Sequence, residues 1–461
     1  MLIRLFSIVS LLWAPLAPAG LVDPFRVHEF TLSNGIRLFV QEDHRAPVAI
    51  LQVWYKVGSA DESPGLTGIS HVLEHMMFKG TERYPGNRFF ELIDANGGEE
   101  NAFTSRDYTV YYELLEQGRL EIAFELEADR MRNLLMREAD FEKERRVVME
   151  ERRMRTEDRP EALALETLYA LAFDNVPYGH PIIGWMGDLE GLTLPDLKDW
   201  YARWYSPANA RLVVVGDVDP AAIRALAEKH FGRVPAHRPP QRRVVAAVPP
   251  RGPRRAVVRA PARLPYLVMG YRTPSLGQGE DDAEPYVLDV ISNLLDGGQS
   301  ARLARRLVRG AEVAASAGTG YNTYGRYDGL FLIDGVPAEG HGVAELEQAL
   351  LGEIRALREA PVDPDELERV KAQVVAAEIY SRDSISRQAS LIGAAETIGL
   401  GWRVLNEYVA RIQAVTPEQV QAVARKYLVP ERRSVVVVEP LPIGGPARPV
   451  QAAAGAGEAV R

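Results

Sequence analysis

Apolar and polar positions repeat with two different periods along this chain, and the two periods separate strands from helices. Alternating runs rich in β-branched and aromatic residues predict strands, and the Asn34-Gly35 pair is a strong signal for a hairpin turn. The predicted strands are His28–Leu32, Ile36–Val40, Val48–Tyr55 and Thr104–Leu115. Helical periodicity predicts helices at Gly68–Phe78, at Pro85–Asn96, from Leu120 to about Arg155, and at Pro160–Ala172.

The second half of the chain repeats a pattern found in the first half. The stretch Thr193–Val215 has a gap-free counterpart 223 residues later, Thr416–Val438. Each copy has the pattern of a capped helix, a Pro-containing turn and a buried strand, so two similar halves are predicted. Between them, residues 235–253 are rich in Pro and Arg and are predicted to form an extended linker.

The helix predicted at Gly68–Phe78 carries the clearest chemistry. His71 and His75 are four residues apart, so on a helix their imidazoles stack one turn apart and can reach a single point. Glu74 lies close enough to hold a water at that point without binding the metal itself. This H-x-x-E-H order is that of inverted zincins, which favours a zinc site with Glu74 as general base. The alternative is a core helix with two hydrogen-bonded histidines.

A catalytic zinc needs a third protein ligand and one open position. The best source is the helical stretch Asp140–Met154, in which an apolar stripe marks the inward face. That stripe consists of Phe141, Glu144, Val147 or Val148, Glu151 and Met154. Glu150 lies about 100° away, among basic residues. Glu151 is therefore the predicted ligand, Glu144 is the acid predicted to orient a ligand histidine, and Glu150 is the alternative ligand.

With these residues the chain resembles the pitrilysin family of zinc peptidases, in the branch of mitochondrial processing peptidase and its bacterial relatives. The resemblance covers almost the whole mature chain. Glu151 follows His75 by 76 residues, which matches the family's spacing between the second histidine and the third ligand. The resemblance implies that His71, His75 and Glu151 bind one Zn²⁺, that Glu74 is the general base, and that Glu144 orients a ligand.

Other stretches agree with this family in place and order. Thr31–Gly35 is similar to its opening strand and turn, and Gly58-Ser59 to the loop before the metal-binding helix. Asn101, Ala102, Phe103 and Thr104 are similar to its substrate-side strand, beside which a peptide would add as a further strand. The predicted fold class is α+β, with two similar halves that each consist of a mostly antiparallel sheet packed against helices, and that together enclose a chamber.

The second half lacks the metal-binding residues, because Tyr286–Leu295 takes the place of the histidine-bearing helix without such a set. In the family this half can present an Arg and a Tyr to the peptide, in a stretch that begins like Ser300–Leu303. Here the aligned positions are Val308 and Ala315, and Arg309 and Tyr321 could replace them only after a local shift. The predicted partner is therefore a related subunit without the zinc motif, in a heterodimer, or else a second copy in a homodimer.

The first 19 residues combine a basic start, an apolar run and a small-residue site at Ala17–Ala19, which predicts a cleaved secretory signal, with a retained anchor as the alternative. No later run has the length of a membrane span. The chain has no Cys, so no disulfide is expected, and the predicted location is periplasmic or secreted. The net charge of −9 argues against nucleic-acid binding and gives a mild bias towards basic or neutral substrates.

The predicted function is that of a zinc-dependent endopeptidase, which hydrolyses peptides or unfolded polypeptides through a metal-activated water. The alternatives are a non-catalytic assembly subunit or a peptide-binding subunit of the same fold. His180, in a loop rich in Pro and Gly, is predicted to be structural. The predicted segments are a signal peptide at 1–19, an N-terminal catalytic domain at 20–234, the linker at 235–253, a C-terminal non-catalytic domain at 254–440, and a disordered tail at 441–461.

Overall fold

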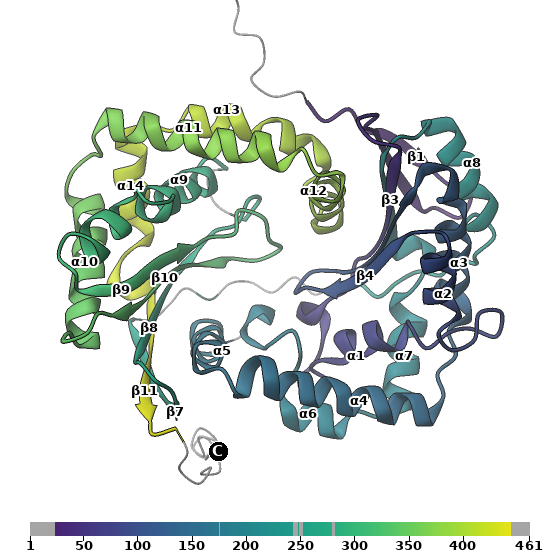
Figure 1. The fold of residues 1–461 in the computed structure, drawn as a ribbon, viewed down its shortest axis with the longest axis horizontal. Helices are drawn as coiled ribbons and strands as arrows, with labels where there is room; N and C mark the ends of the chain where they lie inside the picture. The colour runs from purple at the N-terminus through teal and green to yellow at the C-terminus, as the bar shows by residue number, and fades with distance from the viewer. Residues whose placement is uncertain (1–23, 175, 243–247, 249–251, 279–281, 444–461) are drawn as a thin grey trace, which may run out of the picture.

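Two β-sheets, each covered by helices, face each other across the centre of the molecule (Figure 1). The computed structural model describes residues 24–174, 176–242, 248, 252–278 and 282–443. The helices of these residues are α1 (Ile69–Met76), α2 (Arg88–Ala95), α3 (Glu121–Asn133), α4 (Glu138–Arg152), α5 (Pro160–Ala172), α6 (Met186–Gly191), α7 (Leu194–Trp204), α8 (Pro220–His230), α9 (Glu284–Asp296), α10 (Val343–Glu359), α11 (Pro364–Ser381), α12 (Ile385–Ile398), α13 (Tyr408–Gln413) and α14 (Pro417–Tyr427).

The strands form one sheet in each half. The first half contributes β1 (His28–Thr31), β2 (Arg37–Glu42), β3 (Val48–Tyr55), β4 (Glu99–Thr104), β5 (Thr109–Glu116) and β6 (Ala210–Gly216), in the spatial order β1-β2-β6-β3-β5-β4. The second half contributes β7 (Arg254–Pro261), β8 (Tyr266–Thr273), β9 (Ala314–Gly320), β10 (Gly329–Pro337) and β11 (Arg433–Leu441), in the order β7-β11-β8-β10-β9. One pair in each sheet is parallel, β2 with β6 and β7 with β11, and the other pairs are antiparallel.

The repeat predicted from the sequence is visible in the structure. Helices α7 and α14 begin 223 positions apart, and each is capped by a threonine, Thr193 or Thr416, in a capping box. Strands β6 and β11, which follow them, also begin 223 positions apart and lie inside their sheets. The α+β class with two similar, mostly antiparallel halves is confirmed.

One predicted element was wrong. Residues 104–115 do not form a single strand, because the chain turns back between β4 and β5, where the Ser105 amide bonds to the Tyr108 carbonyl at 2.8 Å. Asp107 and the preceding polar residues supply this turn. The turn leaves β4 at the edge of the first sheet, where no strand of the described residues pairs with its other side, so the Asn101–Thr104 stretch has a free edge there.

Each half lends one helix to the sheet of the other half. Helix α5 of the first half packs against β7, β8 and β11, and α12 of the second half packs against β3 and β6. The fit is close at two glycines. A Cβ atom added to Gly393 would lie 2.1 Å from the Trp54 ring, and one added to Gly270 would lie 3.1 Å from Leu168. The two halves therefore share apolar cores at both of these contacts.

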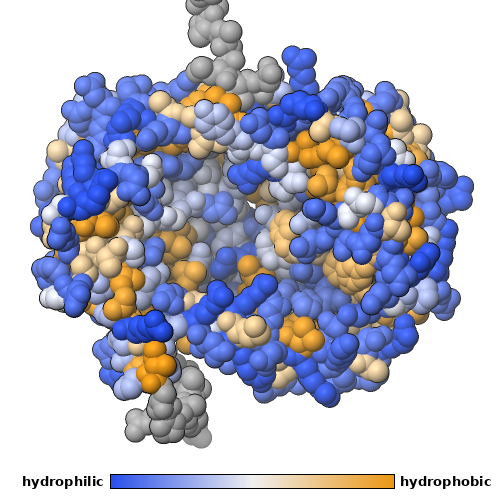
Figure 2. All heavy atoms as spheres, in the orientation of Figure 1, coloured by the Kyte–Doolittle hydropathy of each residue, from blue (hydrophilic) through white to orange (hydrophobic). Residues whose placement is uncertain are grey.

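The predicted signal at 1–19 lies outside the described residues, as do parts of the linker and nearly all of the tail. Between α8 and β7 the described residues contain neither helix nor strand. None of the described helices combines the length and apolar character that a membrane span requires. Figure 2 shows that the face seen in Figure 1 is hollowed between the halves, where residues of both line a cavity of about 700 Å³.

Candidate active site and metal centre

The helix that bears the two histidines is fixed at its start by a buried carboxylate. Glu62 accepts hydrogen bonds from the backbone amides of Gly68, at 2.8 Å, and Ser70, at 2.9 Å, which helix geometry leaves without internal partners. Gly68 adopts φ 88°, a conformation that glycine takes most readily. Burial raises the pKa of Glu62 to about 8, although the two amides oppose this. Apolar residues of α1 then fill the first core and turn its polar residues towards the cavity.

Two histidines of α1 and one glutamate of α4 meet at a single point. One ligand atom from each of His71, His75 and Glu151 can be chosen so that all lie within 4.8 Å of one another. Oε2 of Glu151 lies 3.8 Å from Nε2 of His71 and 3.4 Å from Nε2 of His75. Tetrahedral ligands at zinc distances of about 2.0–2.1 Å are separated by about 3.4 Å. The donor set and its spacing therefore fit a zinc ion.

The geometry separates the two candidate glutamates of α4. Glu151 faces the histidines, whereas Glu150 pairs with Arg153 at 2.9 Å on the solvent side. Of the two valines offered for the predicted inward stripe, Val148 is buried and Val147 is 42% exposed, and the stripe was wrong at Met154, which is 60% exposed. The buried residues of α4 are Phe141, Glu144, Val148 and Arg152. The wider turn of a π-helix at Arg153–Glu157 then changes the helical phase, so Met154 points outward.

A second carboxylate, that of Glu144, contacts the His75 ring on the side away from Glu151. Oε2 of Glu144 lies 3.3 Å from Nδ1 of His75, and its Oε1 lies 2.7 Å from Nζ of Lys79. When Nδ1 carries the proton, Nε2 is left free to bind a metal. Burial raises the pKa of Glu144, but bonds from His75 and Lys79 outweigh it and lower the pKa to about 2. Glu144 is thus an ionised acceptor at neutral pH, and Lys79 adds a partner that periodicity did not suggest.

Glu74 lies beside the cluster and outside it. Its Oε2 accepts a hydrogen bond of 2.5 Å from Oγ1 of Thr104, at the end of β4. Burial raises the pKa of Glu74, and the bond from Thr104 opposes that rise. The arrangement holds a carboxylate next to the candidate metal position without making it a ligand.

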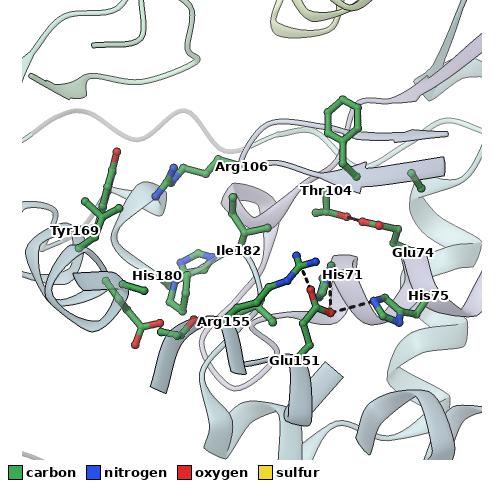
Figure 3. Close-up of a pocket in the computed structure, with 18 of the residues that line it drawn as sticks. His71, Glu74, His75, Thr104, Arg106, Glu151, Arg155, Tyr169, His180 and Ile182 are labelled. Atoms are coloured by element: carbon green, nitrogen blue, oxygen red, sulfur yellow. Dashed lines mark hydrogen bonds and ion pairs between the residues drawn. The ribbon is translucent and has the colours of Figure 1, made fainter. Parts of the chain in front are cut away.

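These groups open into a cavity of about 710 Å³ (Figure 3). Its wall includes the whole Asn101–Thr104 stretch of the edge strand. His180 also lines the cavity, but it stands outside the metal cluster, and its Nε2 lies 2.6 Å from the carbonyl oxygen of Ser59. Two arginines of the wall were not predicted. Arg155 pairs with Oε1 of Glu151 at 2.7 Å, a contact that the four-residue spacing on a helix could have suggested. Arg106 follows the edge strand, at the turn between β4 and β5.

The second half shows what stands in place of the expected Arg and Tyr. Val308 is partly buried against the second core, and Ala315 lies exposed on β9. Arg309 donates a hydrogen bond to the carbonyl of Gln299. Tyr321 lines the cavity between the halves, with its hydroxyl donating to the carbonyl of Pro274 at 2.6 Å.

Comparison with known sequences gives matches over most of the chain. Residues 37–185 match the profile of insulinase (peptidase family M16), and residues 191–374 match that of the peptidase M16 inactive domain. Zinc protease PqqE of Helicobacter pylori is 31% identical over 373 residues, which cover 78% of this chain and 81% of that protein. The probable mitochondrial-processing peptidase subunit beta of Arabidopsis thaliana is 27% identical over 421 residues, which cover 89% of this chain and 78% of that protein.

Solved structures share the architecture. A protease from Helicobacter pylori superimposes with a TM-score of 0.85 at 28% identity, over 90% of this chain and 100% of that one. The periplasmic protease PqqL from Escherichia coli gives a TM-score of 0.76 at 20% identity, over 91% of this chain and 48% of that one. The class that this fold and these relatives define is that of two-domain zinc peptidases. Within it, the chain belongs to the insulinase family, peptidase family M16, which confirms the resemblance seen in the sequence.

Proposed function

We propose that this chain is a zinc-dependent endopeptidase that hydrolyses peptides or unfolded polypeptides. The proposal is carried by the position of Glu74 beside two imidazoles and one carboxylate whose ligand atoms lie within 4.8 Å of one another. Membership of a zinc peptidase family supports it. The signal predicted at residues 1–19 and the periplasmic location printed for one structural neighbour support a periplasmic or secreted site of action.

In this proposal His71, His75 and Glu151 hold one Zn²⁺, and Glu144 orients His75. When bound, the ion polarises the scissile carbonyl and lowers the pKa of water towards neutrality. Glu74 takes a proton from the attacking water and later donates it to the leaving amine. Burial raises the pKa of Glu74, and a carboxylate with a higher pKa accepts the proton of the attacking water more readily.

The substrate binds as an added strand. Among the described strands β4 pairs with β5 alone, so the amides and carbonyls along its other edge can pair with an extended peptide. Backbone pairing of this kind demands little of the substrate sequence. It does require that the substrate chain be extended. Short peptides and unfolded polypeptides can enter the cavity between the two halves in that form.

A second polypeptide completes the peptide-holding surface. With Val308 and Ala315 at the positions expected for an Arg and a Tyr, we propose a related subunit without the zinc motif as partner, or else a second copy of this chain. One relative is named as a subunit of a larger peptidase, which supports the first form.

The test combines zinc content with cleavage of an unstructured peptide by the purified mature chain. We expect about one zinc per chain and measurable cleavage. Glu74→Gln should keep the zinc and lose about 10²- to 10⁴-fold in turnover, the usual contribution of a general base. Glu150→Gln, an exposed neighbour of the ligand, is the matched control. Cleavage that survives Glu74→Gln overturns the mechanism, and a zinc-bound chain that cleaves no peptide, either alone or with a related subunit, indicates a peptide-binding subunit instead.

A further inference from the structure

The cavity between the halves contains a guanidinium with no acidic partner. Arg106 lines both the metal-site cavity and the cavity between the halves, which also share Phe103, Tyr169 and Ile182. No carboxylate among the described residues pairs with Arg106, and its buried Nε has no hydrogen-bond partner. A buried donor left without an acceptor is costly, so such a group points to a ligand.

Aromatic rings hold this side chain in place. The guanidinium carbon of Arg106 lies 4.1 Å from the ring centre of Tyr169 and 5.6 Å from that of Tyr178. In the view of Figure 3 it extends beside Tyr169 and away from Glu74. Stacking on ring faces favours the cation without occupying its five N–H donors, whose fork matches a carboxylate. The residue is therefore prearranged to receive an anion.

The charges of the surrounding wall favour the same ligand. Each acid that lines the two cavities already has a partner: Glu74 has Thr104, Glu151 has Arg155, Glu166 has Arg152, and Asp107 has Tyr178. Among the basic residues of the wall, Arg155 is paired, whereas Arg106 and Arg387 have no acidic partner among the described residues. Arginines balance the charges of Glu151 and Glu166, and Arg326 lies 3.7 Å from Asp107, whereas the Thr104 hydroxyl leaves the charge of Glu74 in place. Two unpaired arginines therefore stand against one carboxylate in the wall, and the balance facing the cavity is positive although the whole chain carries a net charge of −9.

The position of Arg106 relates it to the substrate strand. It lies two residues after Thr104, just past the end of the free edge along which a peptide would pair. A peptide whose cleaved bond lies at Glu74 would carry its flanking residues past this point, because an extended chain advances about 3.3 Å per residue.

We propose that Arg106 is a specificity-determining residue that selects substrates bearing a carboxylate a few residues from the cleaved bond. The carboxylate belongs either to an Asp or Glu side chain or to the C-terminus of the peptide, since both fit the same fork. This inference rests on the proposed peptidase function and replaces the mild bias towards basic or neutral substrates expected from the net charge.

The test uses one neutral, unstructured peptide and its matched relatives. In one arm each position around the cleaved bond carries Glu or Gln, and in the other the C-terminus is free or amidated. We expect wild-type kcat/KM to favour the acid over the amide about tenfold in one of the two arms, and that arm identifies the source of the carboxylate. Arg106→Gln should bring the ratio to about one. Arg387→Gln, which removes the other unpaired cation of the wall, should leave the ratio unchanged.

Several outcomes overturn the proposal: a wild-type ratio near one in both arms, a ratio that survives Arg106→Gln, or a ratio that is lost in Arg387→Gln instead. If the wild type binds zinc but cleaves no peptide, the peptidase function fails separately. Binding of the same peptides to zinc-loaded Glu74→Gln, followed by fluorescence anisotropy, then decides the role of Arg106. If Arg106→Gln does not fold, raising the salt from about 0.05 to about 0.5 M must shrink the wild-type preference, because an ionic contact is screened. A preference indifferent to salt contradicts the assignment.

Discussion

Thr104 holds Glu74 through a hydrogen bond of 2.5 Å, which joins the end of the edge strand to the helix that bears the histidines. The strand that would receive the peptide therefore also orients the candidate base. A single hydroxyl couples the place where a substrate binds to the carboxylate that would act on it.

Replacing Thr104 by Val removes this hydroxyl while keeping its shape. Loss of a hydrogen bond to a charged group costs about 1.5 kcal/mol, so kcat/KM should fall about tenfold with zinc content unchanged. The bond from Thr104 lowers the pKa of Glu74, so its loss raises that pKa and moves the acidic limb of the pH–rate profile to higher pH. Thr104→Ser should behave as wild type. Equal effects of Val and Ser would assign Thr104 to packing alone.

Two single variants, Glu151→Gln and Glu150→Gln, test which of these adjacent glutamates binds the metal. Glu151→Gln should weaken zinc binding by more than about 100-fold, since even loss of a residue that only orients a ligand costs about 10- to 100-fold. Glu150→Gln should bind zinc as the wild type does, because Glu150 faces solvent and pairs with Arg153. Zinc content after dialysis against a graded chelator measures both. The reverse order of the two variants would show that Glu150 is the ligand.

The buried Glu62, which accepts hydrogen bonds from the amides at the start of α1, predicts that the stability of the protein depends on pH. The pKa of Glu62 is about 8 in the folded protein, where burial raises it, against about 4.3 in an unfolded chain. Between these values the unfolded chain gives up a proton that the folded protein keeps, so stability falls as pH rises. Glu62→Gln does not titrate. The free energy of unfolding of the wild type should decline relative to this variant by about 1.4 kcal/mol per pH unit.

Urea unfolding of zinc-saturated wild type and Glu62→Gln, at intervals from about pH 5 to about pH 8, measures that decline. A constant difference between the two proteins across this range would show that Glu62 stays ionised in the folded state.

Two mid-helix glycines give opposite predictions for the same substitution. Gly393→Ala places a methyl group against the Trp54 ring, 2.1 Å from its nearest atom, and should destabilise the protein by about 1–3 kcal/mol. Gly352→Ala in α10 meets no atom within 4 Å and should stabilise the protein by about 0.5–1 kcal/mol, because alanine favours a helix. Thermal unfolding compares them. Similar melting temperatures for the two variants would contradict the close contact of α12 with the first sheet.

The proposed partner predicts a gain of activity on reconstitution. A related subunit that supplies an Arg and a Tyr at the positions of Val308 and Ala315 should raise kcat/KM by about tenfold or more, through better positioning of the peptide. The two chains should elute together in size-exclusion chromatography. A purified chain that cleaves peptides at a rate no related subunit increases acts alone or as a homodimer.

The sequence predicted that His71, His75 and Glu151 would come together, and the structure brings them together, because the main part of this group is local. Two histidines one helical turn apart point the same way wherever the helix lies. Glu151 was chosen from a stripe on a second helix, and the structure places it beside the histidines although Met154 of that stripe is exposed. The periodicity assumed one regular helix, whereas the chain changes to a π-helix after Arg152.

The surroundings of Arg106 could not be predicted in the same way. Its two stacking partners come from α5 and from a separate loop, and only packing brings these together with the turn after β4. The pattern of apolar and polar residues within one helix or strand does not indicate which residues of other elements it will contact. The exchange of α5 and α12 between the halves escaped prediction for the same reason, since the repeat indicates that the halves are alike and says nothing of how they meet.

The packing of α12 from the second half on the first sheet has a consequence for folding during synthesis. The face of the first sheet that looks towards the second half, which includes Phe39, Ile50 and Trp54, is covered by α12 (Figure 1), and α12 ends at Ile398. A nascent chain that has completed the whole first half still exposes this apolar face, and it remains exposed until nearly all of the second half has been made. Strand edges and apolar surface left open for so long attract other chains. We therefore expect a first half produced alone to expose this apolar face and to aggregate more readily than the full chain.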